Sequence, residues 1–376
     1  MTTRREFVRD AGVAAAAAAA AAAFGTKALG AGTNPKKTLL ILGGTRFLGP
    51  EIVDAAKASG WTITLFNRGK TNPGLFPDLE KLQGDRNNDL KSLAGRTFDA
   101  VIDTSGYFPR QVRDTATLLG KQGAKQYVFV SSISVYASLG KPGVDETGPV
   151  AVLKDPTIET ITEGSYGGLK ALCEAAAEAA MPGRATNVRP GLIVGPNDGT
   201  DRFTYWPVRV AKGGEVLAPN TPADPVEVID VRDLGTWIVK MIDTKTFGVF
   251  NATSAPIRMG DMLEACKAAS GSDARFTWAS AAFLKEQKVE EWSDMPVWTS
   301  PEGDDAGGGL VSNARAVAKG LTFRPLKATA KDTLDWWKKQ PKERTAKLKS
   351  GLSEERETAV LKAWHESQAK KAPKAG

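Results

Sequence analysis

The sequence predicts an α/β fold, built on a doubly wound parallel sheet and followed by a smaller C-terminal α/β lobe, from three observations. An apolar run of strand length at 37–42 ends in glycines and precedes a segment with helical spacing. Further apolar runs alternate with helical segments as far as residue 180. These runs are largely unbroken, which is typical of parallel strands that are buried on both faces.

The elements follow in a regular order. Strands are predicted at 37–42, 62–67, 81–84, 99–103 and 126–131, and helices at 50–59, 111–119 and 166–180. Strands and helices alternate in this way in doubly wound sheets, where ligands bind beyond the carboxyl ends of the strands. The expected ligand site therefore lies at the ends of the first and fourth strands.

The first 30 residues have the layout of a twin-arginine export signal. Arg4 and Arg5 precede an apolar, alanine-rich run at 11–24, which is shorter than the roughly 20 residues that span a bilayer. No stable membrane span is expected here. We expect residues 1–30 to be read by the twin-arginine export machinery and the protein to be periplasmic or otherwise exported. The alternative is an alanine-rich helix that merely begins with two arginines.

The positive charge lies at the two ends of the chain. The net charge is +7, yet residues 31–330 contain 34 basic and 34 acidic residues. Nucleic-acid binding depends on clustered Lys and Arg, so a neutral body does not favour nucleic acid as a partner. Residues 346–376 are expected to form a charged helix and tail.

Histidine and cysteine are too scarce for several kinds of site. The chain has one histidine, His365, and two cysteines, Cys173 and Cys266. A zinc or iron–sulfur site built on these residue types is excluded, and so is a disulfide framework. His365 falls in the charged C-terminal helix, where it is expected to be solvated. Any catalysis must therefore use hydroxyls, carboxylates, lysines or a cofactor.

A glycine-rich turn after the first strand predicts a dinucleotide site. Glycines at such a turn allow tight bending, close approach of backbone amides to a pyrophosphate, and packing of the helix on the strand. Arg46 occupies the position of the middle glycine, where its charge could meet a phosphate. The candidate residues are Gly43, Gly44, Thr45, Arg46, Phe47, Leu48 and Gly49.

The end of the second strand favours NADP over NAD. An acidic residue there would bind the ribose hydroxyl of NAD and repel the 2′-phosphate of NADP. The chain instead has Asn67 and Arg68, followed by Lys70. NAD is the alternative cofactor if the two basic residues are solvated loop charges.

A Tyr-x-x-x-Lys pair supplies the candidate chemistry. Tyr166 and Lys170 share one face of the helix predicted at 166–180, after a strand that ends in Ser131 and Ser132 and before the run 188–196. With the glycine turn, this order resembles the extended short-chain dehydrogenase/reductase family, the NAD-dependent epimerases and dehydratases, over about residues 37 to 340.

The resemblance implies a role for each candidate residue. Tyr166 would be the general acid/base, Ser132 would hold the substrate oxygen, and Lys170 would bind the nicotinamide ribose. Lowering the pKa of a tyrosine by about three units takes roughly 4 kcal/mol, which Lys170 and the nicotinamide charge would supply together. Asp85 would contact the adenine. The remaining cofactor candidates are Arg86, Thr104 and Pro190.

Two domains follow, with further candidates in the second. Residues 36–198 are expected to form a Rossmann-like NAD(P)-binding domain, and 199–345 a substrate lobe interleaved with it. Glu146 is a candidate for a polar contact with the substrate. Tryptophans of the lobe are expected mainly in its core, with stacking on a sugar as the alternative: Trp206, Trp237, Trp278, Trp292, Trp298, Trp336 and Trp337. Members of this family often pair through two helices, so a homodimer is also considered.

The leading functional hypothesis is an NAD(P)-dependent oxidoreductase or epimerase that moves hydride at a hydroxyl-bearing carbon of a sugar-like or polyol-like substrate. Because an exported enzyme lacks a supply of reduced nicotinamide, a redox-neutral reaction with a retained cofactor is favoured. Two alternatives stay open. The turn at 43–49 and the strand end at 66–69 also resemble chloroplast stem-loop RNA-binding proteins of the same fold. A dinucleotide-binding protein without catalysis is the other alternative.

Overall fold

The structure is a computed structural model that describes residues 37–303 and 305–371, which belong to one compact unit. The expected export signal at 1–30 and the end of the expected tail lie outside these residues. Among the helices of the described ranges, none is both long and apolar enough to cross a membrane.

A seven-stranded parallel sheet forms the centre, in the order β11-β6-β5-β4-β1-β2-β3. The strands are β1 (Thr38–Leu42), β2 (Thr62–Asn67), β3 (Glu80–Gln83), β4 (Ala100–Asp103), β5 (Gln126–Val130), β6 (Ala185–Pro190) and β11 (Gly248–Ala252). Strand order reverses between β1 and β4, so the carboxyl ends of these two strands flank a crevice. The predicted fold class is confirmed.

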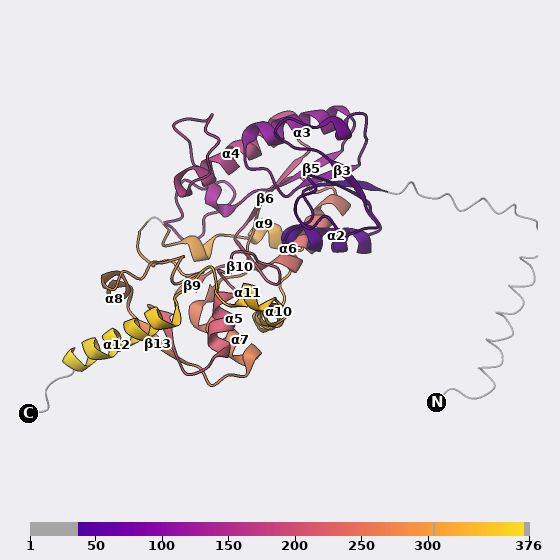
Figure 1. The fold of residues 1–376 in the computed structure, drawn as a ribbon. Coiled ribbons are helices and arrows are strands. Elements are labelled where there is room, and N and C mark those ends of the chain that lie inside the picture. Colours follow the sequence, from indigo (N-terminus) through magenta and orange to yellow (C-terminus); the bar gives the residue numbers. More distant parts are fainter. Residues whose placement is uncertain (1–36, 304, 372–376) are drawn as a thin grey trace, which may run out of the picture. The chain divides into compact units, whose positions relative to one another are not determined.

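Helices cover both faces of the sheet (Figure 1). On one face α2 (Leu48–Ala58) packs against α6 (Val231–Asp243), and on the other α3 (Pro109–Lys121) packs against α4 (Glu163–Ala180). Helix α4 begins three residues before the predicted start, because Thr162 and Ser165 cap each other's backbone amides. This cap fixes the helix that carries both Tyr166 and Lys170.

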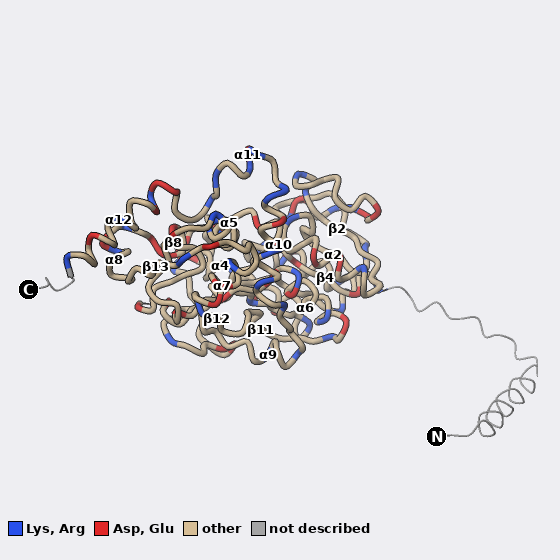
Figure 2. Tube along the Cα trace, turned by 90° about the horizontal axis from the view of Figure 1, so that it is seen from below, with Lys and Arg blue, Asp and Glu red and all other residues tan. Residues whose placement is uncertain are grey.

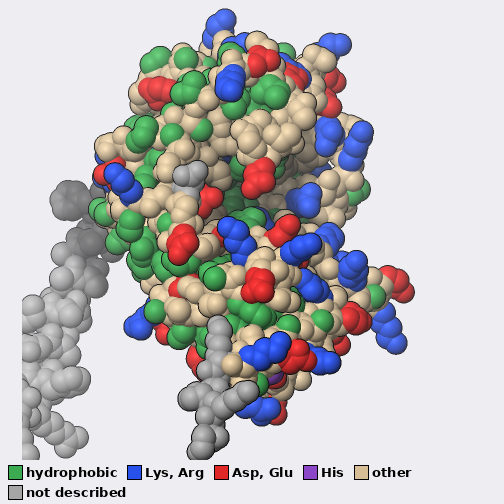
Figure 3. Space-filling view, turned by 90° about the vertical axis from the view of Figure 1, so that its left-hand side faces the viewer, with side chains coloured by type: hydrophobic (Ala, Val, Ile, Leu, Met, Phe, Trp, Pro, Cys, Tyr) green, Lys and Arg blue, Asp and Glu red, His purple; other side chains and the backbone are tan. Residues whose placement is uncertain are grey.

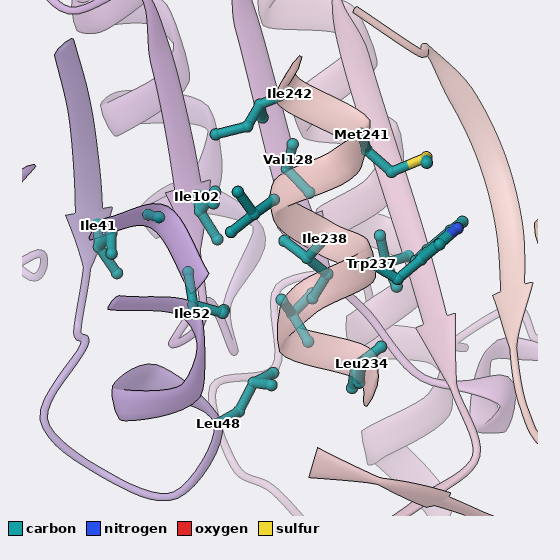
Figure 4. Packing of buried hydrophobic residues seen from close by; sticks show 14 of the residues in the cluster. Ile41, Leu48, Ile52, Ile102, Val128, Leu234, Trp237, Ile238, Met241 and Ile242 are labelled. Atoms are coloured by element: carbon teal, nitrogen blue, oxygen red, sulfur yellow. The ribbon is translucent and has the colours of Figure 1, made fainter. Parts of the chain in front are cut away.

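The α2 and α6 side of the sheet shows why the unbroken apolar strands are needed. Ile41, Ile102 and Val128 project from three neighbouring strands toward Ile52 of α2 and Ile238 of α6, as Figure 4 shows. All five side chains are fully buried. Burial of one such side chain stabilises the fold by about 1.5 to 3 kcal/mol. Each strand is therefore held from this face as well as from the α3 and α4 face.

The C-terminal half of the chain adds a lobe with its own core. Its paired strands are β7 (Leu192–Val194) with β10 (Val228–Asp230), β8 (Glu215–Pro219) with β13 (Arg275–Ala279), and β9 (Pro225–Val226) with β12 (Ile257–Arg258). Its helices are α5 (Tyr205–Ala211), α7 (Met259–Ser270), α8 (Ala281–Glu286), α10 (Leu326–Lys338), α11 (Lys342–Thr345) and α12 (Glu354–Lys371). Helix α9 (Ala314–Ala318) instead packs against β11, and its Ala316 is buried in the core of the central sheet. Single-turn 3₁₀ helices lie at Lys91–Leu93, Ile133–Val135 and Gly308–Leu310.

The last helix packs on this lobe. Val360 and Leu361 of α12 are buried in the lobe's core, and Glu357 bonds to Arg209 and to the amide of Leu217. His365, predicted to be solvated, has a 57% exposed side chain, and its Nε2 lies 2.7 Å from the Glu215 carboxylate. The charged C-terminal segment thus contributes to the lobe as far as it is described.

Most of the lobe's tryptophans serve its packing. Trp206 and Trp298 lie in the core of the lobe, Trp278 packs against it, and Trp337 of α10 is buried. Trp237 of α6 is buried in the core of the central sheet instead. Trp292 differs, because 41% of it is exposed and its ring faces the guanidinium of Arg202.

Candidate active site

A cleft of about 720 Å³ lies at the carboxyl ends of the strands on both sides of the order reversal. Its walls include the glycine turn, the segments after β2, β3 and β4, and Tyr166 and Lys170 of α4. The loop 198–200 forms another part of its lining. The position agrees with the general rule that ligands of doubly wound sheets bind at the strand ends beside the order reversal.

The glycine turn has the features of a phosphate cradle. Gly43 has φ of 102°, and a Cβ on it would lie 2.5 Å from the Thr104 hydroxyl. A Cβ on Gly49 would meet the backbone of Gly44 at 2.5 Å, so glycine lets α2 begin close to the turn. The amides of residues 44–47 donate no hydrogen bond to any other described residue. These free donors, at a helix N-terminus without a side-chain cap, fit an anionic pyrophosphate.

Two residues of the turn, Phe47 and Arg46, have features that a plain glycine turn would lack. Phe47 has φ of 47°, a conformation that L-residues seldom adopt outside functional or tightly packed positions. Arg46 is exposed, and its Nη2 lies 3.0 Å from the place of a Cβ on Gly199. The arginine that replaces the middle glycine therefore lies beside the loop 198–200.

The end of β2 presents its basic side chains to the cleft. The Asn67 amide is used internally, since it donates to Gly43 O at 3.0 Å and accepts from the Gly69 amide at 2.9 Å. Arg68 and Lys70 line the cleft and are exposed. No carboxylate follows β2 at Asn67 or in residues 68–71.

Asp85 and Arg86 differ in how they are used. Asp85 lines the cleft after β3, where its carboxylate accepts from the Asn87 amide at 2.9 Å. Arg86 also lines the cleft, but both its Nη atoms bond to the Asp103 carboxylate at 2.6 Å. The guanidinium that was assigned to the cofactor is thus engaged with a fully buried acid, which explains its fixed position.

Of three other candidates from the sequence, Thr104 lines the cleft and two lie outside its lining. Thr104 donates its hydroxyl to Leu42 O at 2.9 Å and closes the space next to Gly43. Gly49 and Pro190 do not line the cleft, since Gly49 lies within α2 and Pro190 ends β6. The run 188–196 therefore contributes through Ile193 rather than through its proline.

Lys170 is almost fully buried below the cleft. Its ammonium group donates to Val130 O at 2.7 Å and to Gly106 O at 3.0 Å, and it lies 4.3 Å from the centre of the Phe129 ring. Burial lowers the pKa of Lys170 from 10.5 to about 8. The two carbonyls hold the amine in place at the edge of the site.

The expected low pKa of Tyr166 is not found. Burial raises the pKa of Tyr166, and the nearby Tyr107 adds to this, whereas the polar Ser132 and the charge of Arg202 lower it. The Ser132 hydroxyl itself donates to Ser134 Oγ at 3.0 Å. Lys170 is not among these causes, because its ammonium group is turned to the two carbonyls. Within the described protein, the tyrosine alone is therefore a protonated acid at neutral pH.

Three site residues were missed by the sequence interpretation. Tyr107 lines the cleft above Lys170, Asp198 lies in the loop after β7, and Arg202 follows that loop. Tyr107 comes shortly after a strand end at the sheet edge that binds ligands, which is the one signal that could have found it. Glu146, expected near the substrate, instead accepts from the Asn251 amide at 2.8 Å and pairs with Arg315.

The residues present fit a dinucleotide with its reactive end near Tyr166. Free amides at the glycine turn suit a pyrophosphate, and Asp85 and Arg68 continue the lining of the cleft after β3 and β2. The described residues contain no group of three or more His, Cys, Asp and Glu that could hold a metal ion.

Residues 39–252, more than half of the chain, match the NAD dependent epimerase/dehydratase family. The chain belongs to this family. Membership makes a nicotinamide dinucleotide the cofactor class for the cleft, without choosing between NAD and NADP.

Solved structures share the fold. A putative epimerase from Burkholderia cenocepacia is 17% identical, with a TM-score of 0.61 over 83% of this chain and 99% of that one. The Bordetella bronchiseptica enzyme WbmH, in complex with NAD⁺, is 15% identical, with a TM-score of 0.58 over 81% and 99%. A human epimerase family protein with NADPH is 20% identical, with a TM-score of 0.54 over 79% and 99%.

The chain is also similar in sequence to a protein that is not named as an epimerase. The chloroplast stem-loop binding protein of 41 kDa b from Arabidopsis thaliana is 26% identical over 266 residues, 65% of this chain. The chain spans 66% of the length of that protein.

Proposed function

We propose that this protein is an NAD(P)-dependent oxidoreductase or epimerase that acts at a hydroxyl-bearing carbon of a sugar-like or polyol-like substrate. One observation carries the proposal: Tyr166 and Lys170 line the same cleft as the glycine turn. A carbinol loses hydride only as its hydroxyl proton leaves, so a group that accepts this proton must lie within hydrogen-bond reach.

The residues divide this chemistry as follows. Ser132 holds the substrate oxygen. Tyr166 takes the hydroxyl proton as its phenolate, which the positive charge of a bound nicotinamide would favour, and later returns it. Lys170 fixes the carbonyl groups of Gly106 and Val130 at the edge of the site and adds positive charge. A bound nicotinamide would supply the hydride acceptor and donor for the carbinol carbon, which could then be oxidised to a carbonyl and reduced again.

NADP is the proposed form of the cofactor, with Arg68 and Lys70 contacting the 2′-phosphate. Both are exposed in the lining of the cleft directly after β2. Asp85 is proposed to contact the adenine. Residues 44–47 are proposed to bind the pyrophosphate through their amides, with Arg46 adding its charge.

Export through the twin-arginine pathway is also proposed, together with a cofactor that stays bound through each cycle. Replacing Arg4 and Arg5 by lysines should leave the protein in the cytoplasm and its cofactor content unchanged. Cell fractionation followed by immunoblotting measures this. Equal periplasmic amounts of both forms would reject the proposed address.

The function is tested with purified protein from the exported fraction. Native mass spectrometry should show a bound nicotinamide, and Tyr166→Phe should lower turnover by about 10² to 10⁴ while keeping the cofactor. Epimerisation in deuterated water should place no solvent deuterium on the inverted carbon, because the hydride returns from the nicotinamide. Turnover unaffected by Tyr166→Phe would instead indicate a dinucleotide-binding protein without catalysis.

RNA binding is the second candidate, and the chloroplast relative is the observation that favours it. Phosphate contacts need clustered positive charge, whereas basic and acidic residues are interspersed along the chain in Figure 2 and both occur across the face in Figure 3. A labelled hairpin RNA whose mobility shifts with the mature protein, and shifts less at high salt, would favour RNA binding.

A further inference from the structure

We infer that Arg202 and Trp292 form an anion-binding subsite beside Tyr166, which selects a substrate bearing a carboxylate, such as a sugar acid. The inference rests on the proposed function, since it concerns the substrate of the same cleft. It narrows the sugar-like or polyol-like class to its acidic members.

Arg202 is placed by the loop at the edge of the cleft. Its Nε donates to the hydroxyl of Thr200 at 3.2 Å, and Thr200 lines the cleft. Its guanidinium lies 5.3 Å from the centre of the Trp292 ring, which is 41% exposed. Arg202 itself follows the lining residues 198–200, and its charge lowers the pKa of Tyr166.

The loop that carries Arg202 is held rigidly. Its backbone enters the left-handed region at Asn197 and Asp201, where φ is 70° and 63°. Lys349 donates to Gly199 O at 2.8 Å, and Ser350 donates to Thr200 O at 2.9 Å. A guanidinium on such a loop is preorganised for a ligand, which reduces the entropy lost on binding.

The guanidinium lacks an acidic partner. Four other half-buried or buried arginines pair with carboxylates: Arg86 with Asp103, Arg189 with Glu174, Arg209 with Glu357 and Arg344 with Asp201. Arg184, also half-buried, bonds to a backbone carbonyl instead. Among the described residues, no carboxylate lies within 4.0 Å of Arg202, and its two Nη atoms make no hydrogen bond. Its nearest acid, Asp198, is 2% exposed and accepts two hydrogen bonds from Thr200.

This arrangement has an energetic consequence. Burial lowers the pKa of Arg202, and the charges of Asp198 and Tyr166 only partly oppose this. A charge removed from water costs free energy unless it is paired. A bound anion would supply the missing pair, and the free Nη edge would gain the hydrogen bonds that the protein does not provide.

The geometry of arginine selects the anion. A guanidinium has a planar fork that binds a carboxylate through two parallel hydrogen bonds, while its face stacks on an aromatic ring. Trp292 covers one face and leaves the fork for the ligand. A ligand that brings its carboxylate to Arg202 and its carbinol group to Tyr166 is a small hydroxylated acid.

The test uses full-length NADP-saturated protein and isothermal titration with four probes: D-glucuronate and D-galacturonate, and their neutral counterparts D-glucose and D-galactose. Both acids should bind at least about tenfold more tightly than the neutral sugars. Arg202→Gln should remove this preference, and Arg202→Lys should keep part of it. Arg275→Gln, the same charge change at an exposed arginine of the lobe, should leave it intact.

The outcomes distinguish a failure of the anion-binding subsite from a failure of the proposed function. Equal affinity for acids and neutral sugars in the wild type would overturn the subsite. Weaker NADP binding by Arg202→Gln, with unchanged sugar binding, would assign Arg202 to the cofactor's phosphates and also overturn it. If neutral sugars react in a Tyr166-dependent way without an acid preference, the proposed function stands and only the subsite fails. If no nicotinamide binds, the proposed function itself fails.

Discussion

Asp201 of the cleft loop is bonded to Arg344 of α11, with the Nη1 atom of the arginine 2.9 Å from the carboxylate. Asp201 is fully buried and also accepts from the Lys349 amide at 3.0 Å. The chain segment between α10 and α12 therefore holds the loop that carries Thr200 and Arg202. The cleft depends on residues far along the chain from the glycine turn.

The first prediction follows from this pair. Arg344→Gln leaves a buried carboxylate without its cation, so the free energy of unfolding should fall by about 2 to 3 kcal/mol, less than for a fully buried pair because Arg344 is 22% exposed. The KM for substrate should rise more than kcat falls, since the loop binds rather than reacts. Urea denaturation and steady-state kinetics measure both effects.

A matched control is available on α10. Lys331→Gln breaks the exposed pair with Asp335, whose side chains are 57% and 43% exposed, and should leave stability unchanged within error. If Arg344→Gln behaves like this control, the loop does not depend on the C-terminal segment.

The second prediction concerns pH and Lys170. Its pKa is about 8 in the folded protein against 10.5 ordinarily, so below pH 8 the folded state pays for a buried charge that the unfolded chain carries freely. Between pH 8 and 10.5 the unfolded chain binds more protons, and the free energy of unfolding should rise by about 3 kcal/mol from this group.

Lys170→Met isolates this effect. The variant lacks the titrating group, so its advantage over the wild type should shrink as the pH rises through this window. Urea denaturation of both proteins at several pH values gives the difference. If the difference in free energy of unfolding between the two proteins stayed constant with pH, the lowered pKa of Lys170 would be contradicted.

The third prediction tests the choice of cofactor. Arg68→Ser and Lys70→Ser each remove a charge from the wall after β2, so each should raise the dissociation constant for NADP about tenfold. Binding of NAD, which lacks the 2′-phosphate, should be unchanged. Lys91→Ser, an exposed lysine that does not line the cleft, is the control for charge alone. Equal losses of affinity for NADP and NAD would indicate that Arg68 and Lys70 contact the pyrophosphate instead.

Features that depend on local patterns could be predicted from the sequence. The strands and helices of the dinucleotide domain follow from apolar runs, and the glycine turn and the Tyr166 and Lys170 pair follow from spacing. The start of α4 was missed because a cap between Thr162 and Ser165 extends the helix. The exact start of a helix therefore depends on the one or two residues that cap it.

Features that depend on contacts between distant segments could not be predicted. Arg202 meets Trp292 and Asp201 meets Arg344 only after the lobe has folded, and no spacing rule links them. Arg86 follows Asp85 directly, yet its charge is used by Asp103 on another strand. Side chains that share a motif can therefore have unrelated partners.

The last prediction concerns Glu227, which the proposed chemistry does not use. Its Oε2 accepts from the Val311 amide at 3.3 Å, and its Oε1 has no hydrogen-bond partner among the described residues. A Cβ on Gly191 would lie 2.4 Å from this Oε1, so the carboxyl group is enclosed closely. Burial raises the pKa of Glu227 well above its ordinary value.

Because of this raised pKa, we expect Glu227→Gln to increase the free energy of unfolding at neutral pH. The wild type gains stability from a neutral carboxyl group below the unfolded pKa of 4.5 and loses it as the pH rises toward the folded pKa. Glutamine stays neutral throughout, so the variant should match the wild type in acid and be more stable than it at neutral pH. Glu174→Gln is the matched contrast, because it strips Arg189 of its buried partner and should destabilise the fold at neutral pH. Denaturation curves in acid and at neutral pH distinguish the two, and a loss of stability for both variants would mean that the Glu227 carboxylate is charged and paired.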